Sequence, residues 1–247
     1  MLYYSIAHYY DVSSHRSINK YRNIERHIGK FLEIDIQDKC FILVSAIDSP
    51  RGDNRYDEVK KELENFCKKL VKNNKIYVIV KFNWGGTISA LWESYILLKE
   101  INTEGASYVA HFEEDFGPNS NMNSWYNDAI KLLFQDDNIY IGESNIGRIK
   151  SNNDDDRLMG DFHKGLPRLG NPEVWSDGGF YFSTIEKLKI VEERIGIFHK
   201  GNPNNKYNNA WDGISLGEVG FPTLLFHAGF KFSVLNRSSY FINEWND

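Results

Sequence analysis

Apolar and polar residues alternate in blocks along the first half of the chain, and the lengths of these blocks predict alternating strands and helices. Mainly apolar runs of strand length cover residues 3–9, 41–47, 75–81 and 107–113. Apolar residues recur at the three-to-four residue spacing of an amphipathic helix over residues 21–32, 54–73 and 87–100. Because these strands are mainly apolar rather than alternating and are joined through helices, we expect a largely parallel sheet that helices cover on both faces.

The second half of the chain has a looser pattern, which still predicts three helices and three short strands. The helices are expected over residues 125–134, 184–195 and 216–229. The strands are expected over residues 139–141, 179–183 and 231–235. Ser183 and Glu186 have the spacing of a capping box at the start of the second helix. Gly229 is the residue type that commonly follows the end of a helix.

Two long polar segments separate these elements, one over residues 143–172 and one over residues 199–210. A loop of that length in a compact domain is usually a functional lid or a mobile segment. We therefore expect the first of them to close over a bound ligand. The chain of 247 residues contains no internal repeat and no clear linker, so we expect a single domain.

Composition limits the classes of partner and location. The chain has 41% hydrophobic and 26% charged residues, as ordinary globular proteins do, and a formal net charge of −5. We expect no nucleic-acid partner, because the phosphate backbone attracts basic proteins. No apolar run approaches the ~18 residues of a transmembrane helix, and residues 1–10 lack the pattern of a signal peptide. Cys40 and Cys67 are expected to be reduced, buried thiols, which predicts a cytoplasmic location.

The most informative motif is the acidic end of the fourth predicted strand. Glu113, Glu114 and Asp115 follow an apolar run directly, and a turn is expected at Gly117-Pro118-Asn119. Open α/β sheets bind ligands at the carboxyl ends of their strands. If the extended geometry persists to Phe116, Glu113 and Asp115 share one face and suit a divalent cation. The alternative is a solvated acidic turn.

Three further landmarks follow other elements of the same pattern. Asp48 closes the second strand, Asn83-Trp-Gly85-Gly86 joins the third strand to its helix, and Gly217-Glu218 lies eleven residues before Gly229-Phe-Lys-Phe232. Each has a purely structural alternative. Asp48 can begin a Ser-Pro turn, and the glycine pair can form a strand-to-helix turn. Glu218 can cap its own helix through Ser215.

In this order and spacing, the four landmarks resemble those of the inverting GT-A glycosyltransferases, the family-2-like enzymes that use nucleotide sugars. The resemblance implies a single GT-A-like α/β domain, with a nucleotide-sugar-binding half over residues 1–118 and an acceptor-binding half over residues 119–247. It also implies transfer of a sugar from a UDP- or GDP-sugar to a hydroxyl of a glycan or other acceptor. Mn²⁺ or Mg²⁺ would neutralise the departing diphosphate as a Lewis acid, and a carboxylate would take the proton of the acceptor hydroxyl.

The family's roles can be carried over residue by residue. The resemblance implies that Glu113 and Asp115 bind the metal, and that Glu218 is the base, with Asp212 and Asp177 as reserves. It implies donor contacts from Asp48, Asn83, Gly85, Gly86 and Glu114. It implies acceptor contacts from Trp175, Asp177, Gly178, Gly179 and Trp211.

The sequence also departs from the family pattern. Glu113 stands where the family's metal motif has its first Asp, and Gly217 stands where the base is preceded by Glu. Gly220 replaces an acid that often follows the base, and the usual Arg is Leu224 or Leu225. A catalytically inactive carbohydrate- or nucleotide-binding module of the same fold is therefore one alternative. A sugar-nucleotide nucleotidyltransferase is another, although residues 10–16 lack the glycine-rich phosphate loop of that class.

Overall fold

The structure of the chain is a computed structural model. The described residues are 1–10, 21–47, 55–83, 86–101, 107–118, 125–135, 137–148, 174–196, 221–222, 225, 228–235 and 241–243. Within them, only the backbone is described for residues 86, 143–148, 174–178 and 241–243. None of the described helices combines the length and apolarity that crossing a bilayer requires.

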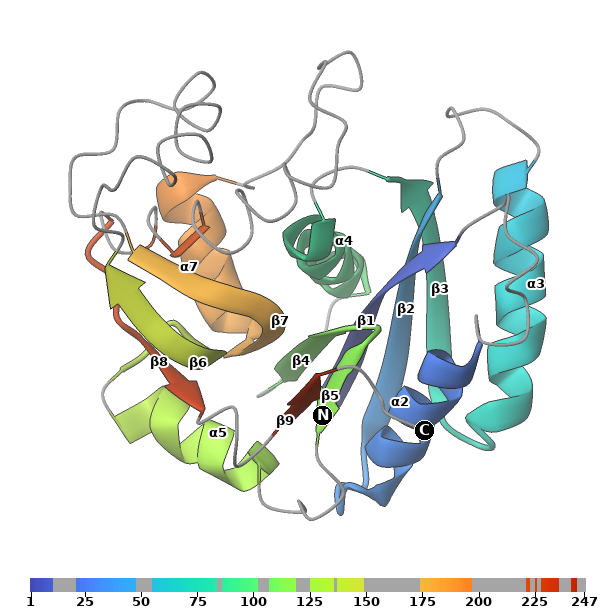
Figure 1. The fold of residues 1–247 in the computed structure, drawn as a ribbon, viewed down its shortest axis with the longest axis horizontal. Helices are drawn as coiled ribbons and strands as arrows, with labels where there is room; N and C mark the ends of the chain where they lie inside the picture. The colour runs from blue at the N-terminus through green and yellow to red at the C-terminus, as the bar shows by residue number, and fades with distance from the viewer. Residues whose placement is uncertain are drawn as a thin grey trace.

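Every strand and helix predicted for the first half is present (Figure 1). The strands are β1 (Leu2–Tyr10), β2 (Lys39–Ile47), β3 (Lys75–Phe82) and β4 (Tyr108–Glu113). The helices between them are α2 (Arg22–Glu33), α3 (Arg55–Leu70) and α4 (Gly86–Glu100). The later elements are β5 (Phe116–Pro118), α5 (Trp125–Gln135), β6 (Tyr140–Arg148), β7 (Val174–Thr184), α7 (Ile185–Ile195), β8 (Phe232–Leu235) and β9 (Phe241–Asn243).

The central sheet has seven strands in the order β3-β2-β1-β4-β7-β6-β8. The pairs β1–β2, β2–β3, β1–β4 and β6–β8 are parallel, whereas β7 is antiparallel to both β4 and β6. A separate two-stranded sheet pairs β5 with β9. The α/β class and the mostly parallel central sheet, expected from the apolar pattern and from the GT-A resemblance, are therefore confirmed.

Two hydrophobic cores lie on opposite faces of this sheet, because successive strand side chains point to opposite sides. Helices α2, α3 and α5 cover one face, and that core includes Tyr4, Phe31, Phe41, Phe112, Trp125 and Phe180. Helices α4 and α7 cover the other face, and that core includes Tyr3, Trp92, Tyr95, Tyr140, Tyr181 and Phe221. Cys67 lies in the first core and Cys40 in the second, and both are free thiols, as predicted.

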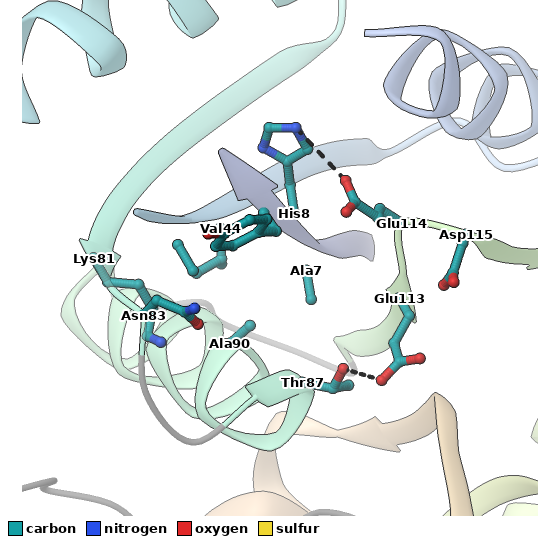
Figure 2. A pocket seen from close by; sticks show the side chains of 12 residues that line it. Ala7, His8, Val44, Lys81, Asn83, Thr87, Ala90, Glu113, Glu114 and Asp115 are labelled. Carbon is teal, nitrogen blue, oxygen red and sulfur yellow. Dashed lines mark hydrogen bonds and ion pairs between the residues drawn. The ribbon is translucent and has the colours of Figure 1, made fainter. Parts of the chain in front are cut away.

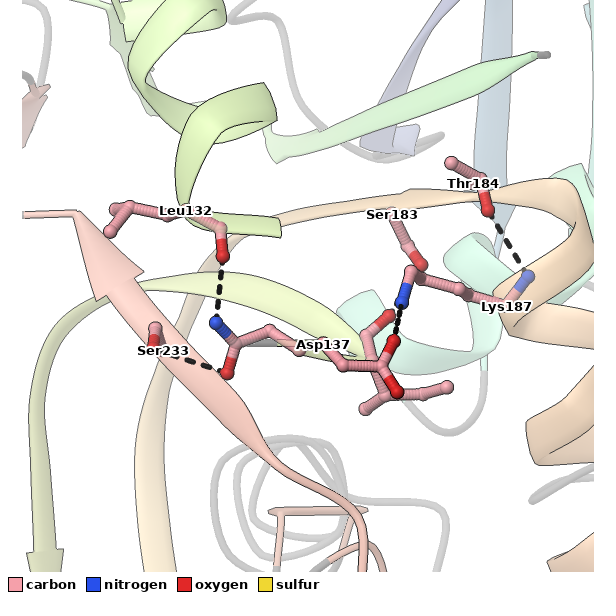
Figure 3. Close-up of polar contacts among 8 residues, drawn as sticks. Leu132, Asp137, Ser183, Thr184, Lys187 and Ser233 are labelled. Atoms are coloured by element: carbon pink, nitrogen blue, oxygen red, sulfur yellow. Dashed lines mark hydrogen bonds and ion pairs between the residues drawn. The ribbon is translucent and has the colours of Figure 1, made fainter. Parts of the chain in front are cut away.

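Helix α7 starts one residue later than the predicted capping box requires (Figure 3). The side chain of Thr184 caps this helix by accepting a hydrogen bond from the backbone N–H of Lys187 at 3.1 Å. Ser183 is still part of β7, and its hydroxyl donates to the carbonyl oxygen of Ile139 at 2.6 Å. The capping box of Ser183 with Glu186 is therefore wrong. The cap is the next hydroxyl residue, because strand pairing holds Ser183.

Strand ends in the second half also differ from the prediction. β6 continues to Arg148, and β7 begins at Val174, so the polar segment expected from residue 143 begins with strand. The expected turn at Gly117-Pro118 is instead strand β5, which pairs with β9. Residues 149–173 and 197–220 lie outside the described part, and with them the rest of the expected lid.

Gly229 ends its helix as predicted. It has a φ of +77°, a conformation that glycine adopts without steric cost. The N–H of Phe230 donates to the carbonyl of Leu225 at 2.9 Å, which is the hydrogen bond of a Schellman motif.

Candidate functional site

A pocket of about 200 Å³ lies at the carboxyl ends of the parallel strands (Figure 2). Strands β2 and β3 follow β1 on one side of the sheet and β4 lies on its other side, so the strand order reverses between β1 and β4. Ligands of open α/β sheets bind at such a reversal. The pocket is lined by Ala7, His8, Tyr9, Val44, Ala46, Lys81, Asn83, Thr87, Ala90, Glu113, Glu114 and Asp115.

The three consecutive carboxylates all line this pocket, but their geometry differs from the prediction. β4 ends at Glu113, and Glu114 and Asp115 form a turn, so the extended geometry does not persist to Phe116. The hydroxyl of Thr87 donates to Oε1 of Glu113. Oε2 of Glu114 lies 3.6 Å from Nε2 of His8. Asp115 is exposed at the pocket. The turn, rather than strand alternation, places all three acidic residues at the pocket.

The two predicted metal ligands, Glu113 and Asp115, differ in how well they are placed to bind a metal ion. Among the residues that the structure describes, no group of three or more His, Cys, Asp or Glu side chains is placed to hold a metal ion. Mg²⁺ and similar hard cations are commonly bound by one or two carboxylates, with waters and substrate phosphates completing the shell. The exposed carboxylate of Asp115 fits such a site. Glu113 is already engaged by Thr87. Metal binding by Asp115 and Glu113 stays a prediction.

The predicted donor residues are partly brought together. Asn83 and Glu114 line the pocket, and the N–H of Asn83 donates to the carbonyl of Ile47 at 2.9 Å, which ties the end of β3 to the end of β2. Gly86 is the first residue of α4, directly before the pocket residue Thr87. Asp48 and Gly85 lie outside the described residues.

Three polar residues at the pocket were missed from the sequence. His8 and Lys81 are 3% and 5% exposed, and each lies near the carboxyl end of a mainly apolar strand. Nδ1 of His8 also makes a 2.9 Å hydrogen bond with the hydroxyl of Ser45 in β2. The third is Thr87, in the first turn of α4. Polar residues near the carboxyl ends of apolar runs were the available signal for His8 and Lys81.

The predicted base and acceptor residues are mostly undescribed. Glu218, Asp212 and Trp211 lie outside the described residues. The backbone of β7 is described, however, and Phe180 pairs with Phe112, the residue before the end of β4. The antiparallel strand from Trp175 to Gly179 therefore continues past the carboxyl end of β4. This part of β7 contains the predicted acceptor residues Trp175, Asp177, Gly178 and Gly179.

Comparisons with known proteins give only distant similarities. No protein-family model matches the chain, and no curated protein matches it either. Among solved structures, HddC from Yersinia pseudotuberculosis is 14% identical, with a TM-score of 0.45 over 98% of this chain and 93% of that one. Mouse xyloside xylosyltransferase 1 in its apo form is 10% identical, with a TM-score of 0.43 over 96% and 86% of the two chains.

A third solved structure is similar to the same degree. The nucleoside-diphosphate-sugar pyrophosphorylase from Vibrio cholerae RC9 is 11% identical, with a TM-score of 0.42 over 98% of this chain and 95% of that one. At such low identity and TM-score, these similarities assign neither a family nor an activity to this chain.

Proposed function

We propose that this protein is a glycosyltransferase that moves a sugar from a UDP- or GDP-sugar to an acceptor hydroxyl, with inversion at the anomeric carbon and with Mn²⁺ or Mg²⁺. The observation that carries the proposal is the pocket at the strand-order reversal, which three carboxylates, Lys81 and Asn83 line. The acidic turn Glu113–Asp115 forms one wall, and Lys81 and Asn83 lie across the pocket from it (Figure 2).

A nucleotide diphosphate would be bound at this pocket through a metal ion and through Lys81 and Asn83. Asp115 would hold the divalent cation, which supplies Lewis-acid stabilisation of the departing diphosphate when it is bound. Lys81 adds a positive charge on the opposite wall, where a phosphate or a polar base edge can be bound. Asn83 offers both a donor and an acceptor for a base or ribose.

The protein also has to take a proton from the acceptor hydroxyl. We assign this role to Glu218, with Asp212 and Asp177 as the alternatives, because a carboxylate on the acceptor side can act as the general base. The β7 backbone at Trp175–Gly179 lies next to the end of β4, which supports acceptor binding beside the acidic turn.

The test is binding of a panel of UDP- and GDP-sugars, measured by thermal shift and calorimetry with Mn²⁺ and with EDTA. A ligand that binds only the folded state raises its stability. We expect one donor to stabilise the wild type only with metal, and Asp115→Asn to weaken its binding by at least about tenfold, or ~1.4 kcal/mol.

Asp38→Asn is the matched control, because Asp38 is an exposed aspartate just before β2, at the opposite end of the sheet. It should bind the same donor as the wild type does. Metal-dependent donor binding that survives Asp115→Asn unchanged would contradict the metal assignment. Failure of every nucleotide sugar in the panel to bind the wild type would contradict the proposed function itself.

A further inference from the structure

Two fully buried histidines reach the site from opposite faces of the sheet, and no catalytic role above uses them. His27 belongs to α2, and His111 belongs to β4 and points toward α4. Each makes one hydrogen bond to a side-chain hydroxyl and at least one to a backbone carbonyl at the edge of the pocket.

The contacts of His27 define its tautomer. Nε2 lies 3.0 Å from the carbonyl oxygen of Glu113 and 3.2 Å from that of Glu114. A carbonyl can only accept a hydrogen bond, so Nε2 carries the proton. Nδ1 then accepts from the hydroxyl of Tyr4 at 2.9 Å. Burial lowers the pKa of His27 to about 3, so the imidazole is neutral at physiological pH.

His111 repeats this arrangement on the other face. Its Nε2 lies 3.1 Å from the carbonyl oxygen of Thr87, in the first turn of α4, and therefore carries the proton. Its Nδ1 accepts from the hydroxyl of Ser5 at 2.8 Å, and Ser5 lies 2.7 Å from the hydroxyl of Ser94. Burial lowers the pKa of His111 to about 3 as well.

The two sets of contacts meet at Glu113. Its carboxylate accepts from the hydroxyl of Thr87 (Figure 2). Its carbonyl oxygen accepts from His27, and the carbonyl of Thr87 accepts from His111. Glu113 is thus fixed through its backbone from the α2 face and through its side chain from the α4 face. The residues that follow it, Glu114 and Asp115, start from a restrained position.

We propose that His27 and His111 are positioning residues, which hold the acidic turn and the first turn of α4 in a fixed arrangement at the edge of the pocket. This role rests on the proposed function only where it concerns ligand binding. Hydrogen bonds that aim two backbone segments at one ligand reduce the reorganisation that binding requires.

A matched pair of substitutions separates positioning from simple core packing. The side-chain nitrogen of Gln lies about as far from the backbone as Nε2 of His, and the polar atoms of Asn lie about as far as Nδ1. His27→Gln therefore keeps a donor for the carbonyls of Glu113 and Glu114, whereas His27→Asn keeps only a partner for Tyr4. His111→Gln and His111→Asn make the same distinction at Thr87.

The first readout is amide hydrogen exchange without ligand. We expect His27→Asn to speed exchange in peptides covering residues 113–118 by about tenfold, the effect of losing one buried hydrogen bond. His27→Gln should stay within about threefold of the wild type. The His111 pair should behave likewise in peptides covering residues 86–91. Melting temperature is measured in parallel, because all four variants should lose some stability.

The second readout is affinity for the Mn²⁺–nucleotide sugar that binds the wild type best. We expect the Asn variants to bind about tenfold more weakly than the Gln variants. If the exchange pattern holds but no nucleotide sugar binds the wild type, the positioning role stands and the proposed function fails. If a nucleotide sugar binds but Asn and Gln variants are alike in both readouts, the positioning role is wrong.

If the variants do not fold, a measurement on the wild type tests the positioning role of His27 and His111. Long-range ¹H–¹⁵N correlation spectra report which ring nitrogen of each histidine carries the proton. The proposal requires the Nε2–H tautomer for both His27 and His111, with protected Nε2–H protons. An Nδ1–H tautomer at either residue would overturn the proposal for that residue.

Discussion

The two faces of the central sheet hold the same kind of hydrogen bond in very different surroundings. On the α2 face, the hydroxyl that supports His27 belongs to Tyr4, whose ring lies 4.8 Å from Phe112 and 5.2 Å from Phe31, measured between centroids. On the α4 face, the hydroxyl that supports His111 belongs to Ser5, which also contacts Ser94. A large aromatic ring does on one face what two small serines do on the other.

Because of this difference, the contributions of packing and of hydrogen bonding can be measured separately on the two faces. On the α2 face the polar group is attached to a ring that also fills the core, so a change to its aromatic neighbours is expected to disturb the site. On the α4 face the polar group contributes little buried area, so a change should act mainly through lost hydrogen bonds.

The largest effect should come from the aromatic core of the α2 face. Phe112 is fully buried, and its ring centroid lies 4.8 Å from that of Tyr4 and 4.9 Å from that of Phe180. Phe112→Ala should lower the free energy of unfolding by about 3–5 kcal/mol. Val109→Ala, on the same strand but facing the other core, should cost roughly 1–2 kcal/mol. Urea denaturation measures both, and a loss below about 2 kcal/mol for Phe112→Ala would contradict the role of its ring in this core.

Acid should destabilise both faces through their histidines. The folded pKa of His27 and of His111 is about 3, below the ordinary value of 6.5. Only the unfolded chain binds a proton at these residues between pH 6.5 and 3, so stability is complete above pH 6.5 and falls as the pH drops. From pH 6.5 to 5 the two should together cost about 3 kcal/mol.

His27→Gln removes one of the two titrating groups, so it should roughly halve this loss between pH 6.5 and 5. Urea denaturation at several pH values measures the slope of stability against pH for both proteins. A slope that is the same in the wild type and in His27→Gln would show that His27 does not titrate as its burial requires.

The hydroxyl groups allow a direct comparison at a smaller scale. Tyr4→Phe keeps the ring but leaves Nδ1 of the buried His27 without its donor, which should cost about 1–2 kcal/mol. Ser5→Ala removes the donor to His111 and also a partner of Ser94, so we expect a somewhat larger loss, of about 2–3 kcal/mol. Thermal and urea denaturation measure both. A larger loss for Tyr4→Phe would mean that the serine hydroxyls are readily replaced by water.

The sequence predicts most of the described strands and helices, but not all of their ends. Apolar runs predict β1 to β4, and apolar spacing predicts the buried stripe Val59, Leu63 and Cys67 of α3. The ends of β6 and β7 were not predictable, because strand pairing sets them: Arg148 pairs with Val174 although neither lies in an apolar run. Local pattern therefore predicts elements well, and predicts poorly those ends that depend on a partner strand.

The residues of the candidate site likewise differ in whether the sequence predicts them. Asn83 and the acidic residues 113–115 could be found because they directly follow apolar strands, and strand ends meet at one edge of a sheet. His27 could not, because it lies 86 residues from Glu113 in sequence and reaches it only through the packing of α2 against the sheet. Its helical position in an apolar stripe looks like that of any core residue.

The smallest effects should come from two surface carboxylates, one for each face. Glu192 in α7 accepts hydrogen bonds from Lys99 of α4 at 2.7 and 2.8 Å and from the hydroxyl of Tyr95 at 2.6 Å. Glu62 in α3 accepts from the hydroxyls of Tyr10 and Tyr21, and neither of these donors is charged. Glu192→Gln and Glu62→Gln should each cost less than about 1 kcal/mol, a fall in Tm below about 4 °C.

Salt and pH should separate these two carboxylates. The hydrogen bond from Lys99, followed by that from Tyr95, holds the pKa of Glu192 below its ordinary value. The stability that Glu192 contributes is therefore fully present above the ordinary pKa and is lost as the pH falls through the lowered pKa.

Because the screening length shrinks to about 3 Å in 1 M salt, the Tm difference between the wild type and Glu192→Gln should narrow in 1 M NaCl. The difference for Glu62→Gln should not change, since its partners are neutral hydroxyls. Equal salt sensitivity at both positions would show that Lys99 contributes no measurable charge interaction to the contact between α4 and α7.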